Sequence, residues 1–427
     1  MQRVKAVPDE DIALLMDVIG SDAKAASLEL ALASTVAKNL ALHSGAKSIR
    51  RNIQVILDAN GADVKEASAN RAEAAFIDRL ALTRERVLAM ADGLDEVAKL
   101  TDPIGEVIGN WTRPNGLRIS RVRVPLGVIG IIYESRPNVT ADAGALCIKS
   151  GNAAILRGGS ESFNSSHAIA ACLSEGLEAA DLSRRCIQLV PTRSREAVGE
   201  MLGMVNYIDV IIPRGGKSLT ERVSQDSKVP VLKHLDGICH VYLDAGADPL
   251  KAANITLNAK MRRTGICGAA ETVLVHKDAV EAVLPGVVKG LLASGCEVRG
   301  DVVTQLVDGR VVPVSEEDWD TEYLAPIISV RVVESLQDAI AHVSKHGSHH
   351  TDSIITEDAE SAEVFMNLVD SGIVLHNAST QFADGGEFGM GAEIGISTGK
   401  LHARGPVGVE QLTSYKYLVR GEDQVRP

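Results

Sequence analysis

The chain has 427 residues, more than a single hydrophobic core usually organises, so we expect two or three domains. Hydrophobic residues make up 45% and aromatic residues only 3%, a balance that favours helices and buried strands over aromatic recognition surfaces. The formal net charge of -12 argues against nucleic acid or an anionic membrane as the main partner, because both attract positive protein surfaces.

The N-terminal region is predicted to be helical. From residue 8 to about 102, Ala, Leu, Glu and Lys dominate and apolar residues recur at three and four positions. We expect Asn60-Gly61 and Gly93 to punctuate the successive helices. From Gly105 to Val124 short β-branched runs surround Asn115-Gly116, which predicts a β-hairpin. Because the whole chain is acidic, the hairpin's arginines are interpreted as solvated or subunit-docking groups rather than a nucleic-acid arm: Arg113, Arg118, Arg121 and Arg123.

Two alternations of strands and helices follow the hairpin. In both, continuously apolar strands are separated by single helices, which indicates parallel sheets covered on both faces. The first is a doubly wound nucleotide-binding layout with strands at 128–133, 153–157, 187–190 and 207–212, and helices at 141–150, 165–180 and 194–204. The second has strands at 240–243, 272–275, 327–332, 353–356 and 372–376, and helices at 254–259, 279–293, 339–342 and 359–369. We expect a domain boundary near Leu235 to His240. The chemistry is expected in the cleft between the sheets, since open α/β sheets bind ligands at strand carboxyl ends and domain interfaces.

The six cysteines show no metal-ligand spacing and no disulfide framework. The N-terminus carries acidic residues before any apolar run and lacks a small-residue cleavage site, so no secretory signal is expected. The longest strongly apolar stretch, Val124 to Tyr133, is about half the length that a membrane-spanning helix needs. We therefore expect a protein of the reducing cytoplasm with no membrane partner.

Cys267 is the cysteine whose neighbours favour reactivity. Gly265 and Gly268 bracket it and leave room for a substrate carbonyl, and three cations precede it: Lys260, Arg262 and Arg263. Positive charge and backbone N–H groups stabilise a thiolate, which is the reactive form. The alternative is an inert buried thiol, an interpretation that fits Cys147 and Cys172 on helical apolar faces. The three cations could hold an anionic substrate or a phosphate leaving group, or form an ordinary solvated face.

Two glycine-rich turns are candidates for cofactor binding, although the chain has no Gly-x-Gly-x-x-Gly fingerprint after its first predicted strand. Arg157-Gly158-Gly159-Ser160 follows one strand, and Pro213-Arg214-Gly215-Gly216-Lys217 follows another. Ordinary strand-to-helix turns would explain the glycines, whereas turn amides with an attached cation suit a phosphate. Their equivalent positions in one domain favour contact with cofactor phosphates.

Two further segments have more than one interpretation. His346, His349 and His350 could bind a metal, but no second ligand cluster has suitable spacing, so we predict no metal and favour loop or substrate contacts. Gly385 to Gly391 is interpreted as a mobile loop near the cleft or, equally, as a tight crossing of elements.

The order of these motifs resembles the aldehyde dehydrogenase superfamily, and more closely its branch of γ-glutamyl phosphate reductases. The resemblance covers nearly the whole chain and rests on the cysteine loop and on four further segments: 124–138, 149–153, 233–237 and 346–353. It implies an α/β fold with two doubly wound domains and an oligomerisation ribbon. The implied division gives residues 1–104 and 125–238 to cofactor binding, 105–124 and 405–427 to the ribbon, 239–384 to catalysis, and 385–404 to a return loop.

The same resemblance implies roles for particular residues. Cys267 is the nucleophile, Arg157 takes the place of the superfamily's cofactor-ribose lysine, and Glu322 orients the nicotinamide ribose. His234 stands where hydrolytic members carry the glutamate that activates water, so a thioester should survive to receive hydride. Ser135 and Asn138 are both candidates for the oxyanion hole. The other implied cofactor contacts are Gly158, Ser160, Pro213, Arg214, Gly215 and Gly216, and the implied substrate or phosphate contacts are Arg136, Lys260, Arg262, Arg263, His349 and His350.

The implied reaction is NADPH-dependent reduction of L-glutamyl 5-phosphate to L-glutamate 5-semialdehyde and phosphate through a cysteine thioester, the second step of proline biosynthesis. A hydrolytic NAD-dependent aldehyde dehydrogenase and a non-catalytic thiol redox sensor are the alternatives. The implied partners are a small-molecule substrate and further copies of the chain, with channelling from glutamate 5-kinase left open.

Overall fold

The computed structural model describes residues 11–72, 74–233 and 235–426. The chain forms two compact units, each built from several segments. Unit 1 comprises Met1–Lys233, Gly389–Gly395 and Val407–Pro427, and unit 2 comprises His234–Phe388 and Ile396–Pro406. In the described residues, no helix is both long and apolar enough to cross a membrane.

Unit 1 begins with helices, as predicted: α1 (Ile12–Leu30), α2 (Thr35–Arg51), α3 (Ile53–Ala69), α4 (Ala74–Leu80) and α5 (Arg84–Lys99). The prediction that Asn60-Gly61 and Gly93 lie between helices is wrong, because they lie inside α3 and α5. Asn60 is buried, and its amide donates to the carbonyl of Leu80 at 2.9 Å and to Ser165 Oγ at 3.0 Å. These distant partners satisfy a residue that, judged locally, favours a turn.

The sheet of unit 1 has four parallel strands in the order β5-β4-β3-β6. They are β3 (Val128–Tyr133), β4 (Ala153–Gly158), β5 (Ile187–Leu189) and β6 (Val210–Arg214), connected by α6 (Val139–Lys149), η2 (Ser160–Ser162), α7 (Phe163–Ala179), η3 (Arg184–Cys186) and α8 (Glu196–Gly203), with α9 (Lys217–Asp226) after β6. The chain builds outward from β3 to β5 and then returns to place β6 on the other side of β3. The carboxyl ends of β3 and β6 therefore form a topological switch point, where doubly wound sheets bind ligands.

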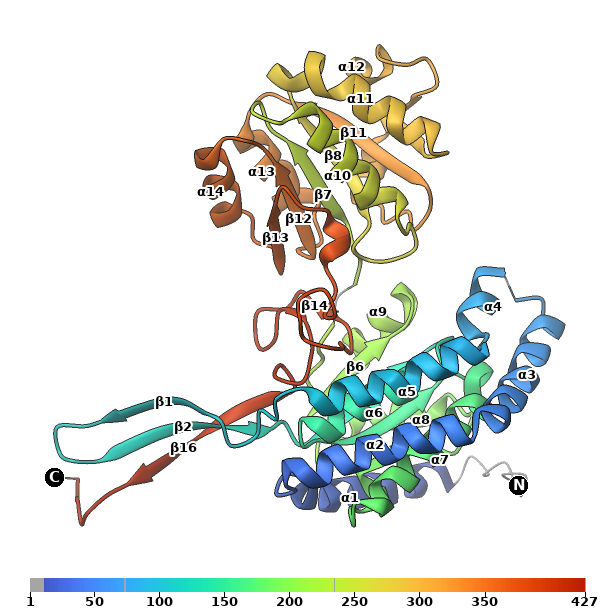
Figure 1. Ribbon diagram of the computed structural model, residues 1–427, viewed down its shortest axis with the longest axis vertical. Helices are drawn as coiled ribbons and strands as arrows, with labels where there is room; N and C mark the ends of the chain where they lie inside the picture. The colour runs from blue at the N-terminus through green and yellow to red at the C-terminus, as the bar shows by residue number, and fades with distance from the viewer. Residues whose placement is uncertain (1–10, 73, 234, 427) are drawn as a thin grey trace. The chain divides into compact units, whose positions relative to one another are not determined.

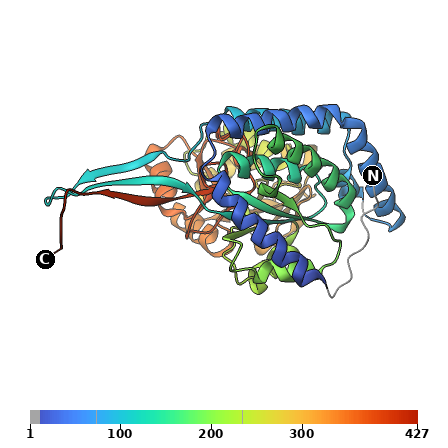
Figure 2. The same ribbon diagram turned by 90° about the horizontal axis from the view of Figure 1, so that it is seen from below.

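Helices cover both faces of this sheet (Figures 1 and 2). Helix α1 packs with α8 and α9 against apolar side chains of β3 and β4 in one continuous buried cluster. Helices α6 and α7 contact the strands as well, and α2 and α5 pack on these two helices as a further layer. The predicted doubly wound arrangement is thus present, with α9 as a helix that the sequence pattern did not indicate.

A three-stranded antiparallel ribbon projects from the rest of unit 1 (Figures 1 and 2). It consists of β1 (Val107–Thr112), β2 (Arg118–Pro125) and β16 (Thr413–Arg420), with β2 in the middle. The predicted hairpin is present, and Gly116 has the positive φ of 88° that its turn requires. Aromatic side chains stay exposed on the ribbon, including Trp111 at 40% and Tyr417 at 54%.

Unit 2 contains a seven-stranded sheet in the order β10-β9-β11-β8-β7-β12-β13, with every pair parallel. The strands are β7 (Cys239–Leu243), β8 (Ala270–His276), β9 (Glu297–Gly300), β10 (Val312–Pro313), β11 (Ile327–Val333), β12 (Thr351–Ile355) and β13 (Ile373–His376). The short strands β9 and β10, which lie at one end of the sheet with β10 at its edge, were not predicted. A separate two-stranded pair joins β14 (Ile396–Ser397) to β15 (Gly405–Pro406).

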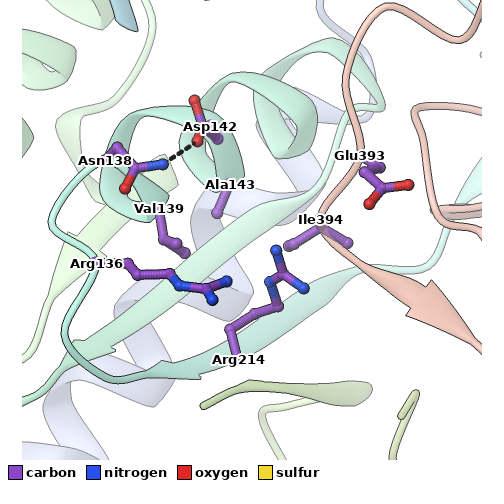
Figure 3. A pocket seen from close by; sticks show the side chains of 8 residues that line it. All are labelled: Arg136, Asn138, Val139, Asp142, Ala143, Arg214, Glu393 and Ile394. Carbon is purple, nitrogen blue, oxygen red and sulfur yellow. Dashed lines mark hydrogen bonds between the residues drawn. The ribbon is translucent and has the colours of Figure 1, made fainter. Parts of the chain in front are cut away.

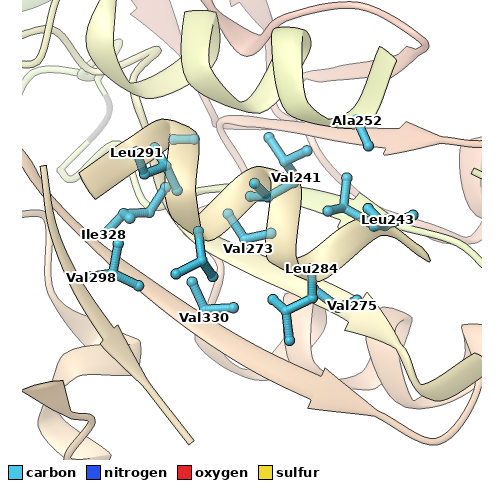
Figure 4. Packing of buried hydrophobic residues seen from close by; sticks show 14 of the residues in the cluster. Val241, Leu243, Ala252, Val273, Val275, Leu284, Leu291, Val298, Ile328 and Val330 are labelled. Carbon is cyan, nitrogen blue, oxygen red and sulfur yellow. The ribbon is translucent and has the colours of Figure 1, made fainter. Parts of the chain in front are cut away.

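Helices also cover both faces of the larger sheet. They are α10 (Pro249–Met261), α11 (Val280–Ala293), α12 (Val302–Gln305), α13 (Leu336–His346) and α14 (Ala359–Leu368), with the 3-10 helices η4 (Lys277–Ala279), η5 (Glu316–Asp320) and η6 (Thr380–Phe382). Val241 and Leu243 of β7 point towards α10 and α11 (Figure 4), whereas Tyr242 between them packs with α13 and α14. This alternation is the period of two that a strand imposes on its side chains.

Candidate active site

Cys267 lies in the loop between α10 and β8 of unit 2 and is partly exposed, whereas the other five cysteines are buried. Its backbone is held closely by two neighbours. The thiol of Cys239 donates to the Cys267 carbonyl at 3.1 Å. Gly237 packs so tightly that a Cβ added there would lie 2.2 Å from the same carbonyl oxygen. The position of the candidate nucleophile is therefore fixed by backbone contacts within unit 2.

The loops around Cys267 meet at the amino edge of the sheet. Cys267 precedes β8, Gly237 precedes β7, Glu322 precedes β11 and His350 precedes β12. For this part of the site, the expectation of a position at strand carboxyl ends is wrong. Because these four strands run parallel, the loops that lead into them converge at one edge. The candidate nucleophile lies in a loop that follows a helix rather than a strand.

Glu322 contributes to the same loop cluster. Its carboxylate accepts a hydrogen bond from the backbone N–H of Gly237 at 2.9 Å. Two residues later, Leu324 has a φ of 51°, a left-handed conformation that is unusual for a non-glycine residue, and its N–H donates to Glu271 at 3.4 Å. Glu322 thus holds the segment that packs on Cys267, and its role toward a cofactor ribose stays a prediction.

Lys260 lies in a different environment from the one expected of a phosphate ligand. Its ammonium is fully buried and forms an ion pair with Glu271, which is 1% exposed. Burial raises the pKa of Glu271 to about 7, although the positive charge of Lys260 acts in the opposite direction. Lys260 therefore pairs with a buried carboxylate on β8, a partner that no pattern in the sequence indicates.

Arg262 and Arg263, the other two predicted phosphate contacts, are exposed. Gln381 holds the loop that contains Arg262 and Arg263 through hydrogen bonds. Its amide donates to the carbonyl of Ala259 at 2.8 Å and to that of Arg263 at 3.1 Å, while its oxygen accepts from Arg262 at 3.5 Å. Sequence reasoning missed Gln381 and Gly237, since each acts on a loop that is distant in the chain.

The three candidate histidines have separate partners. His350 is buried, with Nδ1 at 2.9 Å from Thr351 Oγ1 and 3.7 Å from Cys239 Sγ, so it reaches the cysteine loop through Cys239. His349 is exposed and pairs with a backbone carbonyl at 2.8 Å. His346 is buried and pairs with Asp320 at 2.7 Å. His234, expected in place of the water-activating glutamate, lies outside the described residues.

In unit 1, Arg157 is the last buried residue of β4. It is 6% exposed, and its guanidinium donates to the carbonyls of Gly158, Arg193 and Ser194. Burial lowers the pKa of Arg157. Its Nε has no hydrogen-bond partner among the described residues, which leaves one buried N–H for a ligand. Ser160, the next polar residue of this turn, is exposed.

The second predicted phosphate turn follows β6. Pro213 is buried in that strand, while Gly215 and Gly216 are exposed. The N–H of Gly216 donates to Glu134 at 3.4 Å, and a Cβ on Gly215 would lie 2.6 Å from the same carboxylate. Burial raises the pKa of Glu134. A phosphate at this turn would meet a carboxylate as well as the amides, a feature that the sequence pattern did not reveal.

Residues predicted separately come together at the switch point of unit 1. Arg136, Asn138, Asp142 and Arg214 line a cavity of about 60 Å³, together with Glu393 from the segment Gly389–Gly395 (Figure 3). The Asn138 amide donates to Asp142 at 2.9 Å. Burial raises the pKa of Asp142 to about 6, and the charge of Arg214 opposes this shift. The cavity therefore combines a candidate substrate residue, a candidate oxyanion donor and a candidate cofactor residue.

A family model described as the aldehyde dehydrogenase family matches residues 21–296, more than half of the chain. The chain belongs to this family. Solved structures agree: an acetylating aldehyde dehydrogenase from Geobacillus thermoglucosidasius has a TM-score of 0.69 and 17% identity, over 99% of this chain and 100% of its own, which shows the fold. The predicted fold class is confirmed.

Closer relatives define the branch. The γ-glutamyl phosphate reductases of Rhodospirillum rubrum and Parvibaculum lavamentivorans are each 60% identical, over 98% of this chain and 98% and 99% of their own. The crystal structure of γ-glutamyl phosphate reductase from Thermotoga maritima has a TM-score of 0.94 and 43% identity, over 96% of this chain and 100% of its own. The chain therefore belongs to the γ-glutamyl phosphate reductases, as the sequence motifs predicted.

Proposed function

We propose that the chain reduces L-glutamyl 5-phosphate to L-glutamate 5-semialdehyde and phosphate, with NADPH as the reductant, in the second step of proline biosynthesis. The observation that carries this proposal is 60% identity to γ-glutamyl phosphate reductases over nearly the full length of both chains. This level of identity does not favour a hydrolytic aldehyde dehydrogenase or a thiol redox sensor.

The covalent steps follow from the chemistry of the thiol. The Cys267 thiolate adds to the C5 carbonyl, and the tetrahedral adduct expels phosphate with the C–O bonding pair, which leaves a thioester. NADPH, when bound, supplies the hydride that reduces this thioester. The resulting hemithioacetal alkoxide re-forms its C=O bond as the C–S bond breaks, and the bonding pair leaves with sulfur to give the aldehyde and the thiolate. The exposed Arg262 and Arg263 suit the departing phosphate better than Lys260, because Lys260 is buried against Glu271.

The residues of unit 1 fit a nicotinamide dinucleotide in part. Arg157 keeps a buried Nε–H with no partner in the described part of the chain, and a guanidinium suits a 2′-phosphate. Gly215 and Gly216 lie exposed before α9, where backbone amides can approach a phosphate. Glu134 would oppose an anion there wherever it is ionised, and burial raises its pKa.

The test is an assay of NADP reduction by glutamate 5-semialdehyde, run with and without phosphate. Phosphate-dependent reduction is expected, at a higher rate than with NAD. Cys267→Ser should abolish it, while a buried-thiol control, Cys147→Ser, should keep the phosphate dependence. Equal rates with and without phosphate, with release of glutamate, would instead support a hydrolytic enzyme. Undiminished activity of Cys267→Ser would rule out the covalent mechanism.

We further propose that the protein works in the cytoplasm as a homo-oligomer and receives its acyl phosphate from glutamate 5-kinase. The ribbon of β1, β2 and β16 supports assembly, because β1 and β16 each have a free edge within the described part of the chain and its aromatic side chains are exposed. Transfer from the kinase is supported by the reactivity of an acyl phosphate, which hydrolyses when it is left in water.

A further inference from the structure

A buried ion pair lies close to the cysteine loop and has no part in the covalent steps. The Lys260 ammonium is fully buried and meets the carboxylate of Glu271 at the start of β8, where only 1% of that side chain is exposed. Burying two charges costs free energy, and apolar residues of similar volume often stabilise a protein as well or better. Stability alone therefore does not account for this pair.

Both members of the pair contact the segment that leads into β11. The second carboxylate oxygen of Glu271 accepts the backbone N–H of Leu324 at 3.4 Å, and the Lys260 ammonium lies 5.8 Å from the centroid of the Tyr323 ring, a cation–π distance. Leu324 has a φ of 51°, and such a left-handed non-glycine residue persists only where its surroundings hold it. Because 48% of Leu324 is exposed, packing restrains it little, and the hydrogen bond to the buried carboxylate is its main restraint.

The same segment restrains the candidate nucleophile. Two residues before Leu324, Glu322 accepts the backbone N–H of Gly237 at 2.9 Å. Gly237 in turn packs on Cys267, where an added Cβ would lie 2.2 Å from the carbonyl oxygen. Leu324 also approaches the cysteine loop directly, since its carbonyl oxygen lies 3.9 Å from the position of a Cβ on Gly265. The buried pair is thus connected to the backbone of Cys267 through successive contacts, and all of them lie within unit 2.

Lys260 has a definite part in this arrangement. Burial raises the pKa of Glu271 to about 7, and the positive charge of Lys260 acts against this rise. An ionised carboxylate accepts hydrogen bonds through both oxygens and donates none, so one oxygen receives Lys260 while the other receives the N–H of Leu324. Lys260 therefore favours the form of Glu271 that suits both contacts.

We propose that Glu271, held by Lys260, is a positioning residue for the reaction at Cys267. It fixes the left-handed conformation of Leu324 and, through the segment before it, sets where the backbone of the nucleophile lies. Both members of the pair act through the loops and not on the substrate itself. The expected effect on kcat rests on the proposed function, whereas the effect on the reactivity of the thiol does not.

Two double variants separate the hydrogen bond to Leu324 from the two charges. The first, Lys260→Met with Glu271→Leu, removes the acceptor. The second, Lys260→Gln with Glu271→Gln, removes both charges but keeps an oxygen for the N–H of Leu324. In the phosphate-dependent assay, the first variant should lose about 10- to 100-fold in kcat because the nucleophile is displaced, while its KM stays near that of wild type. The second variant should recover most of this kcat, and urea unfolding checks that both are folded.

Alkylation of Cys267 by iodoacetamide measures the same positioning without relying on catalysis. The rate, read from the mass of the peptide that contains Cys267, should differ from wild type in the first variant and return to wild type in the second. The buried pair of Lys38 and Asp102 in unit 1 offers a matched control. Lys38→Met with Asp102→Leu should leave both kcat and the alkylation rate at wild-type values.

If the first variant does not fold, Leu324→Pro tests the same contact from the other side, because proline has no N–H and cannot adopt a positive φ. A similar loss of kcat is expected. A changed alkylation rate in a protein that lacks phosphate-dependent activity would overturn the proposed function and keep the positioning role. Wild-type kcat and alkylation in the first variant, or equal losses in the two double variants, would overturn the positioning role. A loss of kcat of the same size in the Lys38 and Asp102 control would also overturn it.

Discussion

Gly237 offers a direct test of how the position of Cys267 is fixed. A Cβ at this position would lie 2.2, 2.6 and 2.7 Å from three backbone atoms of Cys267. Backbone atoms cannot rotate away, so Gly237→Ala must move one of the two segments by nearly 1 Å to reach a tolerable contact. Gly237 is not among the described glycines with positive φ, so the alanine is acceptable to its own backbone and only the contact is perturbed.

The expected effect is larger on catalysis than on stability. Overpacking of this kind lowers the free energy of unfolding by about 1–3 kcal/mol. A displacement of about 1 Å at a reacting group can reduce the rate about 100-fold. Gly265→Ala is the matched control in the same loop, because its Cβ would approach nothing closer than 3.9 Å.

Three measurements on the purified variants decide the matter: kcat in the phosphate-dependent assay, the rate of alkylation of Cys267 by iodoacetamide, and unfolding by urea. Gly237→Ala should show a reduced kcat and a changed alkylation rate while it still unfolds cooperatively. The kcat of Gly265→Ala should stay within about threefold of wild type, since its added methyl group makes no close contact. If Gly237→Ala retains full kcat, or if both variants lose activity equally, the contact does not position the nucleophile.

Three further predictions concern other parts of the two units. Lys260→Met alone should destabilise the protein by about 3–5 kcal/mol, because it leaves Glu271 buried without its partner. The double variant, Lys260→Met with Glu271→Leu, should recover most of this loss in urea unfolding. Equal losses in the single and double variants would refute the pairing argument. The folded pKa of Asp142 is about 6 against an ordinary 3.8, so its contribution to stability is complete below about pH 4 and is lost as the pH rises through 6. The difference in stability between wild type and Asp142→Asn should therefore change by up to about 3 kcal/mol between pH 4 and 7, and a flat difference would contradict the burial argument. Trp111→Asp with Tyr417→Asp should reduce the mass measured by light scattering to that of one chain, and an unchanged mass would exclude the ribbon from assembly.

Most strands and helices around both sheets were predictable, because each is an apolar run or a periodic face that depends on local sequence; β9, β10 and α9 are exceptions. The contacts that define the site were harder to predict from the sequence. Lys260 was expected beside a phosphate, but its carboxylate partner becomes apparent only when β8 packs on α10. Arg136 and Arg214 were assigned to different ligands, because their proximity depends on the order of strands in the sheet and not on spacing in the chain. Asn60-Gly61 favours a turn locally, and a hydrogen bond to Ser165 makes the helix acceptable.

The choice of one thiol among six also depends on packing. Burial raises the pKa of Cys147, Cys186 and Cys296 to about 12 each, and that of Cys239 well above its ordinary value. At neutral pH these four are thiols, and Cys239 is used as a hydrogen-bond donor to the backbone of Cys267. Cys267 is the one cysteine that keeps access to solvent. In the proposed reaction the thiolate is both the nucleophile and the leaving group, so a partly hydrated site would allow it to form and to be released, while Gly237 and the Cys239 hydrogen bond hold its backbone in place. The small residues and cations in the sequence singled out Cys267, and the burial of the other five thiols separates it from them in the structure.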